Sequence, residues 1–193
     1  LGDVYKRQIQ NYLADQITVP RFSTELPEFA EAEKAVQARI DHLMGIKGKK
    51  SVDSIHKELG HIMWEYVGMG RTEEGLKTAL KLLKDIRKEF ETNLFIPGST
   101  EGVNIELEKA LRLNDFITMG ELIAYDALNR NESCGGHFRE EYQTEEGEAK
   151  RDDENYFYVS CWEYQGSDDV APVLYKEPLV YEAIKVQTRN YKS

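Results

Sequence analysis

The spacing of apolar residues between positions 27 and 128 restricts the possible folds of this chain more than any other feature. In successive segments the apolar residues recur at intervals of three, four and seven, as at Phe29, Val36, Ile40 and Leu43. This spacing places them on one face of an α-helix. The pattern predicts helices over residues 27–44, 51–67, 72–90 and 105–128.

Residues at the predicted helix ends support these limits. Ser51 and Thr72 are good N-cap residues, because a hydroxyl accepts a hydrogen bond from a free amide of the first helical turn. Pro27 suits a first turn, since its missing N–H would have no partner there. Residues 45–50 and 93–104 contain glycine, proline or lysine at many positions and are predicted to be connections.

The last predicted helix differs from the others in its apolar pattern. From Phe116 to Leu128 apolar residues occupy most faces, and Gly120 lies among them. A helix that is apolar nearly all round is usually buried on several sides. We therefore expect it to pack centrally in the domain, or against a surface that this chain lacks.

The composition changes after Asn129. Residues 140–154 carry many acidic side chains without a clear period, whereas residues 156–164 are aromatic and β-branched and predict a strand. Residues 170–175 and 179–186 are weaker candidates for extended structure. The predicted fold class is mainly α: a bundle of three to four helices, followed by a partly extended C-terminal tail with short β-strands.

Length and charge limit the classes of function. With 193 residues, the chain is expected to form one domain with an appendage. Its net charge of −10 argues against nucleic acid as a partner, because binding a polyphosphate requires an excess of cations. No apolar run reaches the roughly 18 residues that a membrane-spanning helix needs. Cys134 and Cys161 are too few for a disulfide scaffold, and we expect reduced thiols in a cytoplasmic protein.

Motifs for a metal or a nucleotide are missing from the sequence. Glu58 and His61 are spaced like one half of a di-iron site, but there is no second copy of that pair, and a surface role is favoured. His56 and His61 would point in different directions on a helix. The lysines at 47, 49 and 50 are predicted to lie in a solvated loop, and no glycine-rich phosphate-binding motif is present.

The first residues have an unusual composition. The chain begins with Leu1, and residues 3–8 are similar to a translated adapter from DNA library preparation. We therefore interpret residues 1–8 as a non-native leader and expect that a larger N-terminal part precedes the natural sequence. Sequencing of the source gene would test this interpretation.

Residues 129–142 contain the most distinctive cluster of polar side chains. Arg130, Glu132, His137 and Arg139 surround the Gly135–Gly136 pair at the end of the most apolar helix. Glycines permit close backbone approach and positive φ, and the arginines with the histidine could face a carboxylate or a phosphate. The alternative is a structural loop in which these cations pair with neighbouring acids. The residues alone leave both interpretations open.

This segment resembles a signature in the C-terminal part of succinate dehydrogenase and fumarate reductase flavoprotein subunits, Arg-x-Glu-Ser-Arg-Gly-x-His-x-Arg. Cys134 replaces the second arginine of the signature. Residues 59–71, 151–153 and 189–191 are similar to further segments of the same family. The positions that match the signature are Arg130, Glu132, Ser133, Gly135, His137 and Arg139.

The resemblance implies a cofactor and partners. Members of the family bind FAD in a large N-terminal domain, interconvert succinate and fumarate, and pass electrons to an iron–sulfur subunit and a membrane anchor that uses quinone. This predicts a protein on the cytoplasmic face of the inner membrane, with no catalytic residue and no metal ligand in this chain. The residues predicted to support the flavin side are Arg130, Glu132, Ser133, Gly135, His137, Arg139 and Arg189.

The resemblance also suggests a division of the chain. Residues 9–26 are expected to end the missing flavin-domain region, residues 27–130 to form the helical bundle, and residues 131–193 to form the loop and extended tail. Two alternatives remain: the C-terminal domain of an L-aspartate oxidase, and a helical interaction module without catalytic ancestry.

Overall fold

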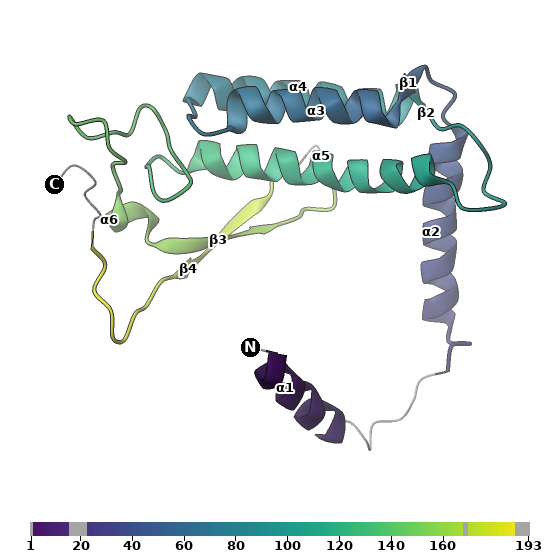
Figure 1. Cartoon of the computed structure of the whole chain (residues 1–193), viewed down its shortest axis with the longest axis horizontal. Coiled ribbons are helices and arrows are strands. Elements are labelled where there is room, and N and C mark those ends of the chain that lie inside the picture. The colour runs from purple at the N-terminus through teal and green to yellow at the C-terminus, as the bar shows by residue number, and fades with distance from the viewer. Residues whose placement is uncertain (1, 16–22, 168–169, 188–193) are drawn as a thin grey trace. The chain divides into compact units, whose positions relative to one another are not determined.

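The computed structural model describes residues 2–15, 23–167 and 170–187, and the chain is mainly α-helical, as predicted (Figure 1). Internal contacts divide it into two compact units, residues 1–45 and 46–193. The second helix therefore groups with the N-terminal unit. The boundaries expected at residues 8, 26 and 130 stay predictions.

The N-terminal unit contains two helices, α1 (Gly2–Asp15) and α2 (Pro27–Gly45). Helix α2 confirms the helix predicted over residues 27–44. Its apolar face is only partly buried: Phe29 and Val36 are more than half exposed, whereas Leu43 is buried. The helical spacing was therefore a correct guide to secondary structure and a poor guide to burial.

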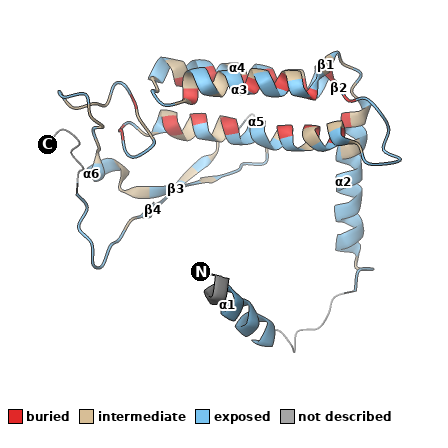
Figure 2. Ribbon diagram, in the orientation of Figure 1, coloured by how far each residue is buried: buried red, intermediate tan, exposed pale blue. Residues whose placement is uncertain are grey.

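Three helices form the centre of the second unit: α3 (Val52–Val67), α4 (Glu73–Asn93) and α5 (Ile105–Asn129). Each of them packs against the other two. Figure 2 shows the buried residues along the sides of these helices. The core contains mainly aliphatic side chains, among them Ile55, Leu59, Leu76, Leu83, Ile86, Leu113 and Ile117.

Side-chain caps begin all three helices. The Ser51 hydroxyl accepts a hydrogen bond from the Ser54 amide at 3.2 Å, and the Thr72 hydroxyl accepts one from the Gly75 amide at 3.0 Å. These contacts confirm both predicted caps. Asn104 caps α5 in the same way, because its side-chain oxygen accepts from the amide of Leu107 at 3.0 Å.

The connections before α3 and after α4 pair as a very short parallel sheet. Strand β1 (Lys50–Ser51) lies beside β2 (Leu94–Phe95), with Lys50 opposite Leu94. The Lys50 ammonium donates to Glu58 and contacts Glu89, each at 2.8 Å, and the hydrogen bonds to these carboxylates raise its pKa. The expected solvated loop is therefore wrong at Lys50, which pins α3 to α4.

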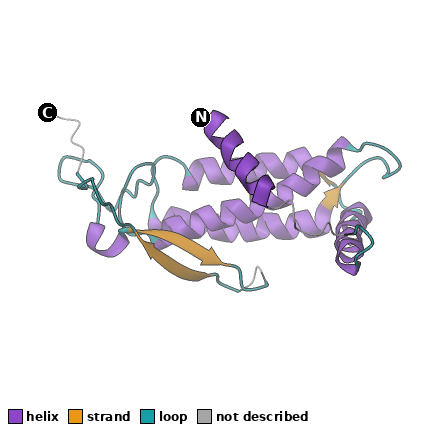
Figure 3. Ribbon diagram, turned by 90° about the horizontal axis from the view of Figure 1, so that it is seen from below, coloured by secondary structure: helices purple, strands orange, loops and turns teal. Residues whose placement is uncertain are grey.

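The tail contains the short helix α6 (Asp153–Tyr156) and two antiparallel strands, β3 (Tyr158–Glu163) and β4 (Val173–Pro178) (Figure 3). Strand β3 confirms the aromatic strand, although it begins after Tyr156. Strand β4 overlaps the extended segment predicted at 170–175, whereas no strand forms over the described residues 179–187. The Leu179 amide still donates to the Phe157 carbonyl at 3.2 Å, but the antiparallel register would place the following residues opposite the α6 turn, which offers no strand edge for pairing.

Helix α5 is covered by α3 and α4 along one side and contacts the tail through Trp162. On another part of its circumference Phe116, Met119 and Ile123 are 47%, 52% and 42% exposed. The expected central packing is confirmed for one face of α5, whereas packing of the other face against a missing surface stays a prediction. None of the described helices is long and apolar enough to span a bilayer.

Candidate functional site

The distinctive loop after α5 is held against the turn that joins α3 and α4. The Arg71 amide donates to the Phe138 carbonyl at 3.0 Å, and the Glu140 amide donates to the Arg71 carbonyl at 2.8 Å. These two backbone hydrogen bonds join segments nearly 70 residues apart in sequence. The loop is therefore part of the folded unit and lies at the ends of two helices.

A tight turn forms the tip of this loop. The amide of Cys134 donates to the carbonyl of His137 at 2.8 Å, and the amide of His137 donates back to Cys134 at 3.0 Å. Gly135 has a φ of +60°, which side chains with a Cβ rarely adopt, whereas Gly136 has no positive φ. Of the two predicted glycines, only Gly135 is required by the turn.

Arg139 is the largest completely buried side chain among the described residues. Its Nη1 donates to the carbonyls of Ala127 at 3.0 Å and Leu128 at 3.4 Å, and its Nε donates to Glu141 at 3.1 Å. A guanidinium is well suited to these free carbonyls at the C-terminus of α5, where the helix dipole is negative. Its Nη2 has no hydrogen-bond partner within the described part of the chain.

Arg71 binds the free carbonyls at the C-terminus of α3, as Arg139 does at the C-terminus of α5. Its Nε donates to the carbonyls of Val67 at 3.1 Å and Gly68 at 3.2 Å. Its Nη1 lies 2.8 Å from Nδ1 of His137, and Nε2 of His137 lies 2.9 Å from the Arg130 carbonyl. A guanidinium can only donate a hydrogen bond, so Nδ1 of His137 must accept one from Arg71 and carry no proton. A carbonyl can only accept, so Nε2 must carry the proton, and the ring is neutral.

Arg130 and Glu132 join the loop to the tail. Arg130 Nη1 donates to Glu132 Oε1 at 2.9 Å and to the Tyr156 carbonyl at 3.0 Å, and the guanidinium carbon lies 5.0 Å from the ring centroid of Tyr158. Glu132, which is 3% exposed, also accepts a hydrogen bond from the Asp152 amide at 2.9 Å. The pair is thus enclosed by its own chain.

Ser133 completes the set of buried polar residues. Its hydroxyl accepts from the Arg139 amide at 2.8 Å and donates to the Arg139 carbonyl at 3.1 Å. The structure therefore brings together six of the seven predicted residues in one network of contacts, and Arg189 lies outside the described residues. We call the Arg71, Arg130, Glu132, Ser133, His137 and Arg139 side chains the loop clamp.

Comparison with known proteins identifies the family to which this chain belongs. Residues 56–191 match the family described as the C-terminal region of fumarate reductase flavoproteins. The chain belongs to this family. The matched span includes α3 from His56 onward, α4, α5, the loop clamp and the tail up to Tyr191.

Several known proteins contain a region that is similar to this chain in sequence or in structure. The fumarate reductase flavoprotein subunit of Proteus vulgaris is 29% identical over 148 residues, which cover 75% of this chain and 24% of that protein. A chloroplastic L-aspartate oxidase of Nicotiana tabacum is 37% identical over 88 residues, covering 46% and 13%. A structure of the Mycobacterium smegmatis Sdh1 complex has a TM-score of 0.65 at 25% identity, covering 86% and 26%. The chain thus spans about a quarter or less of these relatives.

The family implies FAD, and the loop clamp can be compared with the needs of that cofactor. A flavin site presents hydrogen-bond donors toward an open cleft. Here the side chains of Arg130, Glu132, Ser133 and His137 all have partners within the chain, and Arg139 is fully buried. These side chains therefore present no free donors to a cofactor, and the loop clamp is suited to holding backbone segments in place.

Sequence reasoning gave no site role to Arg71, although it is central to the loop clamp. The signal was weak: a single arginine directly after Gly68, Met69 and Gly70 at a helix end. Free carbonyls at the end of a helix favour a cation after the last turn. An arginine directly after a predicted helix end is therefore a candidate for binding them.

Metal sites are also absent from the described part of the chain. No group of three or more His, Cys, Asp or Glu side chains is arranged there to hold a metal. Glu58 accepts hydrogen bonds from Lys50 and Ser54, so it contributes to packing between helices. Cys134 and Cys161 are both free and exposed.

The contacts of His137 predict a dependence of stability on pH. Burial lowers the pKa of His137 below 6.5, the hydrogen bond with the Arg130 carbonyl opposes this, and the nearby guanidinium groups of Arg71, Arg139 and Arg130 lower it further. Below about pH 6.5 the unfolded chain binds a proton that the folded chain excludes. We expect the free energy of unfolding to fall as the pH is lowered from about 7.5 to 5.5.

The His137→Gln variant isolates this contribution. Glutamine offers one donor and one acceptor but does not titrate, and the other three histidines are unchanged. Urea unfolding at several pH values should give a shallower loss of stability for the variant than for the native chain. If the free energy of unfolding changed with pH in the same way for both proteins, the assignment of a neutral, half-buried His137 would be contradicted.

Proposed function

We propose that this chain is the C-terminal domain of the flavoprotein subunit of a succinate dehydrogenase or fumarate reductase. In this proposal FAD and the dicarboxylate are bound outside the chain, and electrons pass to an iron–sulfur subunit and a quinone-reactive membrane anchor. The supporting observation is the family match over residues 56–191, which includes every residue of the loop clamp. The complex would lie on the cytoplasmic face of the inner membrane.

The role that we assign to the loop clamp is positioning. Arg71 and Arg139 each bind the free carbonyls at a helix C-terminus, so α3 and α5 are held to one loop. His137 connects Arg71 to the loop backbone, and Arg130 connects the loop to the tail. These contacts would fix the surface that faces the flavin-binding part of the subunit.

An unpartnered surface supports the presence of such a neighbour. Besides the exposed apolar residues of α5, helix α3 exposes Trp64 at 82%. Gly60 is exposed one turn before Trp64, and a Cβ placed there would meet nothing within 4 Å. A glycine inside a helix costs stability without a packing reason in this chain. Close approach by another part of the subunit would supply that reason.

Gly60→Ala provides a direct check. In the 193-residue chain the variant should raise the free energy of unfolding by about 0.5–1 kcal/mol, because alanine has the higher helix propensity. In a full-length subunit the added methyl group should instead lower stability or flavin content. Thermal unfolding of both proteins is the measurement, and a similar gain in both would argue against a neighbour at Gly60.

The proposed activity requires the full-length subunit. We expect it to reduce a dye with succinate and to reduce fumarate with a reduced viologen, whereas the 193-residue chain should neither bind FAD tightly nor turn over succinate. His137→Ala should lower flavin occupancy of the full-length subunit, with His42→Ala, an exposed histidine of α2, as the matched control. Flavin copurifying with the 193-residue chain, or equal occupancy in both variants, would contradict the proposal.

L-aspartate oxidase is the second candidate, because a relative with that activity has the higher identity over its matched segment. The same preparation distinguishes the two. L-aspartate-dependent formation of hydrogen peroxide without succinate-dependent dye reduction would identify an oxidase. Absence of both reactions in a flavin-loaded subunit would favour a role without catalysis.

A further inference from the structure

The N-terminus of α4 and the loop clamp share one carboxylate. The amide of Glu73, the first residue of α4, donates to Oε1 of Glu141 at 2.6 Å, and Nε of Arg139 donates to Oε2 at 3.1 Å. Helix α4 has 21 residues, so its first amides carry the positive end of the helix dipole. Glu141 therefore connects two separate sources of positive charge, a helix N-terminus and a buried guanidinium.

One donor of that guanidinium is unused. The Arg139 side chain is 0% exposed, and its Nη1 donates to the carbonyls of Ala127 and Leu128. Its Nη2 is buried as well and has no hydrogen-bond partner among the residues that the structure describes. A buried charged donor without a partner is costly. The surroundings of Arg139 therefore lack one acceptor.

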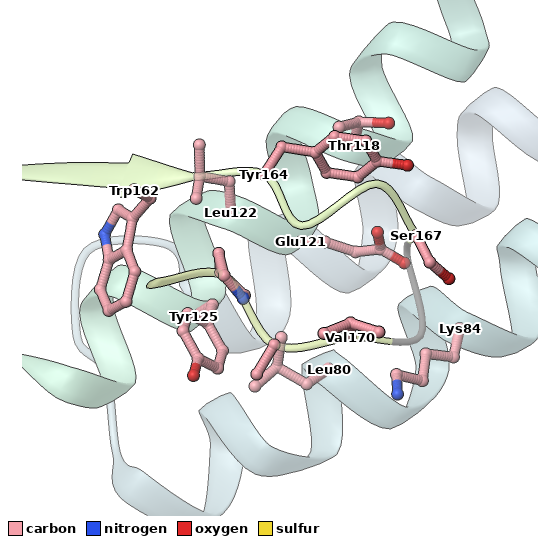
Figure 4. A pocket seen from close by; sticks show the side chains of 12 residues that line it. Leu80, Lys84, Thr118, Glu121, Leu122, Tyr125, Trp162, Tyr164, Ser167 and Val170 are labelled. Atoms are coloured by element: carbon pink, nitrogen blue, oxygen red, sulfur yellow. The ribbon is translucent and has the colours of Figure 1, made fainter. Parts of the chain in front are cut away.

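A second arginine between helices shows where that acceptor belongs. Nε and Nη2 of Arg87 donate to the two carboxylate oxygens of Glu121, and Nη2 also donates to Thr118. Figure 4 shows the side chains of Glu121 and Thr118 on α5. Nε and Nη2 thus form the edge of a guanidinium that a single anion can fill. At Arg139 the same edge is only half filled, because a helix amide takes the other oxygen of the carboxylate.

We propose that the N-terminus of α4 and Arg139 form a binding site for a tetrahedral oxyanion, and that the Glu141 side chain occupies this site in the native chain. Each oxygen of the Glu141 carboxylate already accepts one hydrogen bond. A sulfate or phosphate has further oxygens and can also reach Nη2 of Arg139. The Glu141 side chain is 40% exposed, so its removal opens the site to solvent. The proposal does not depend on the redox function, because every group of the site belongs to this chain.

Glu141→Ala tests the proposal in the 193-residue chain. The variant empties the site and should be less stable than the native chain in sodium chloride. Sodium sulfate at about 20 mM, compared with chloride of equal ionic strength, should then raise its Tm by about 4 °C along a saturable curve, as expected for a ligand that binds only the folded state. If the variant is unfolded in chloride, the recovery of its helical circular dichroism signal with sulfate is the measurement.

The native chain and Glu145→Ala are the matched controls. Glu145 is an exposed acidic residue four positions further along the chain, so this variant loses the same charge but keeps the site filled. Sulfate also stabilises folded proteins in general because it is excluded from their surface, an effect that both controls report. We expect a Tm change below about 1 °C for both of them.

The ligand class and the role of Arg139 require two further comparisons. Calorimetric titration of Glu141→Ala should give about tenfold weaker binding for acetate than for sulfate, since acetate has no oxygen left for Nη2. Arg139→Lys in the same background keeps the charge but loses Nε and Nη2, and it should weaken sulfate binding about tenfold. No saturable effect of sulfate on Glu141→Ala, an equal effect on the native chain, equal affinities for sulfate and acetate, or unchanged sulfate binding after Arg139→Lys would overturn the proposal.

Discussion

Replacement of Arg139 by alanine is expected to lower the free energy of unfolding of this chain by about 3–4 kcal/mol. The substitution removes charge-assisted hydrogen bonds to the Ala127 and Leu128 carbonyls at the end of α5 and to the Glu141 carboxylate. It also leaves an internal space, because the arginine side chain is 0% exposed. Urea unfolding followed by circular dichroism measures the loss.

Two further variants make this prediction specific. Arg139→Lys keeps the charge but not the planar guanidinium that reaches several acceptors, so it should recover only part of the stability. Arg112→Ala removes an arginine whose side chain is 69% exposed and pairs with Glu108 within α5, and it should cost less than about 0.5 kcal/mol. Equal costs for Arg139→Ala and Arg112→Ala would show that the buried contacts contribute little.

Gly48→Ala should destabilise the chain by about 3 kcal/mol for a steric reason. A Cβ at this position would lie 1.9 Å from the backbone carbonyl carbon of Asn93 and 2.0 Å from its oxygen. The backbone must move, which disturbs the hydrogen bonds from the Gly48 amide to Leu94 at 3.0 Å and from the Lys49 amide to Asn93 at 2.9 Å. Thermal unfolding is the simplest measurement.

The matched control is an alanine that meets no neighbour. A Cβ at Gly102, which lies in the connection before α5, has nothing within 4 Å, and Gly102 has no positive φ. Gly102→Ala should therefore change stability by less than about 0.5 kcal/mol. A small effect of Gly48→Ala as well would mean that the β1–β2 pairing adds little to the stability of the helical bundle.

The loop clamp shows how far the sequence could predict the site. The cluster around Gly135 was visible because six positions within ten residues match a family signature. The direction of the side chains was not visible. The bond between Arg71 and His137 joins residues 66 positions apart, and no local pattern encodes that contact. For this reason the predicted flavin-side support stays a proposal.

Tertiary packing also determined the structure of two segments for which the sequence prediction and the fold differ. Residues 179–186 were predicted to be extended, but the ladder ends with β4 at Pro178, because the residues before β3 that would continue the pairing form the helical turn α6. Lys50 belongs to a short basic run, yet two carboxylates on different helices enclose it. In both places the outcome depends on what lies across from the residue in space.

The amino-acid sequence by itself determined the helices of the bundle, the caps at Ser51 and Thr72, and the place of the loop after α5, because helix periodicity and capping are interactions between near neighbours. Only the tertiary structure decided that Arg139 is buried, that Arg71 joins it in one cluster, and that part of α5 stays exposed. The reason is physical: burial and pairing of a charge depend on surfaces contributed by distant segments, and their free energy exists only once the helices have packed.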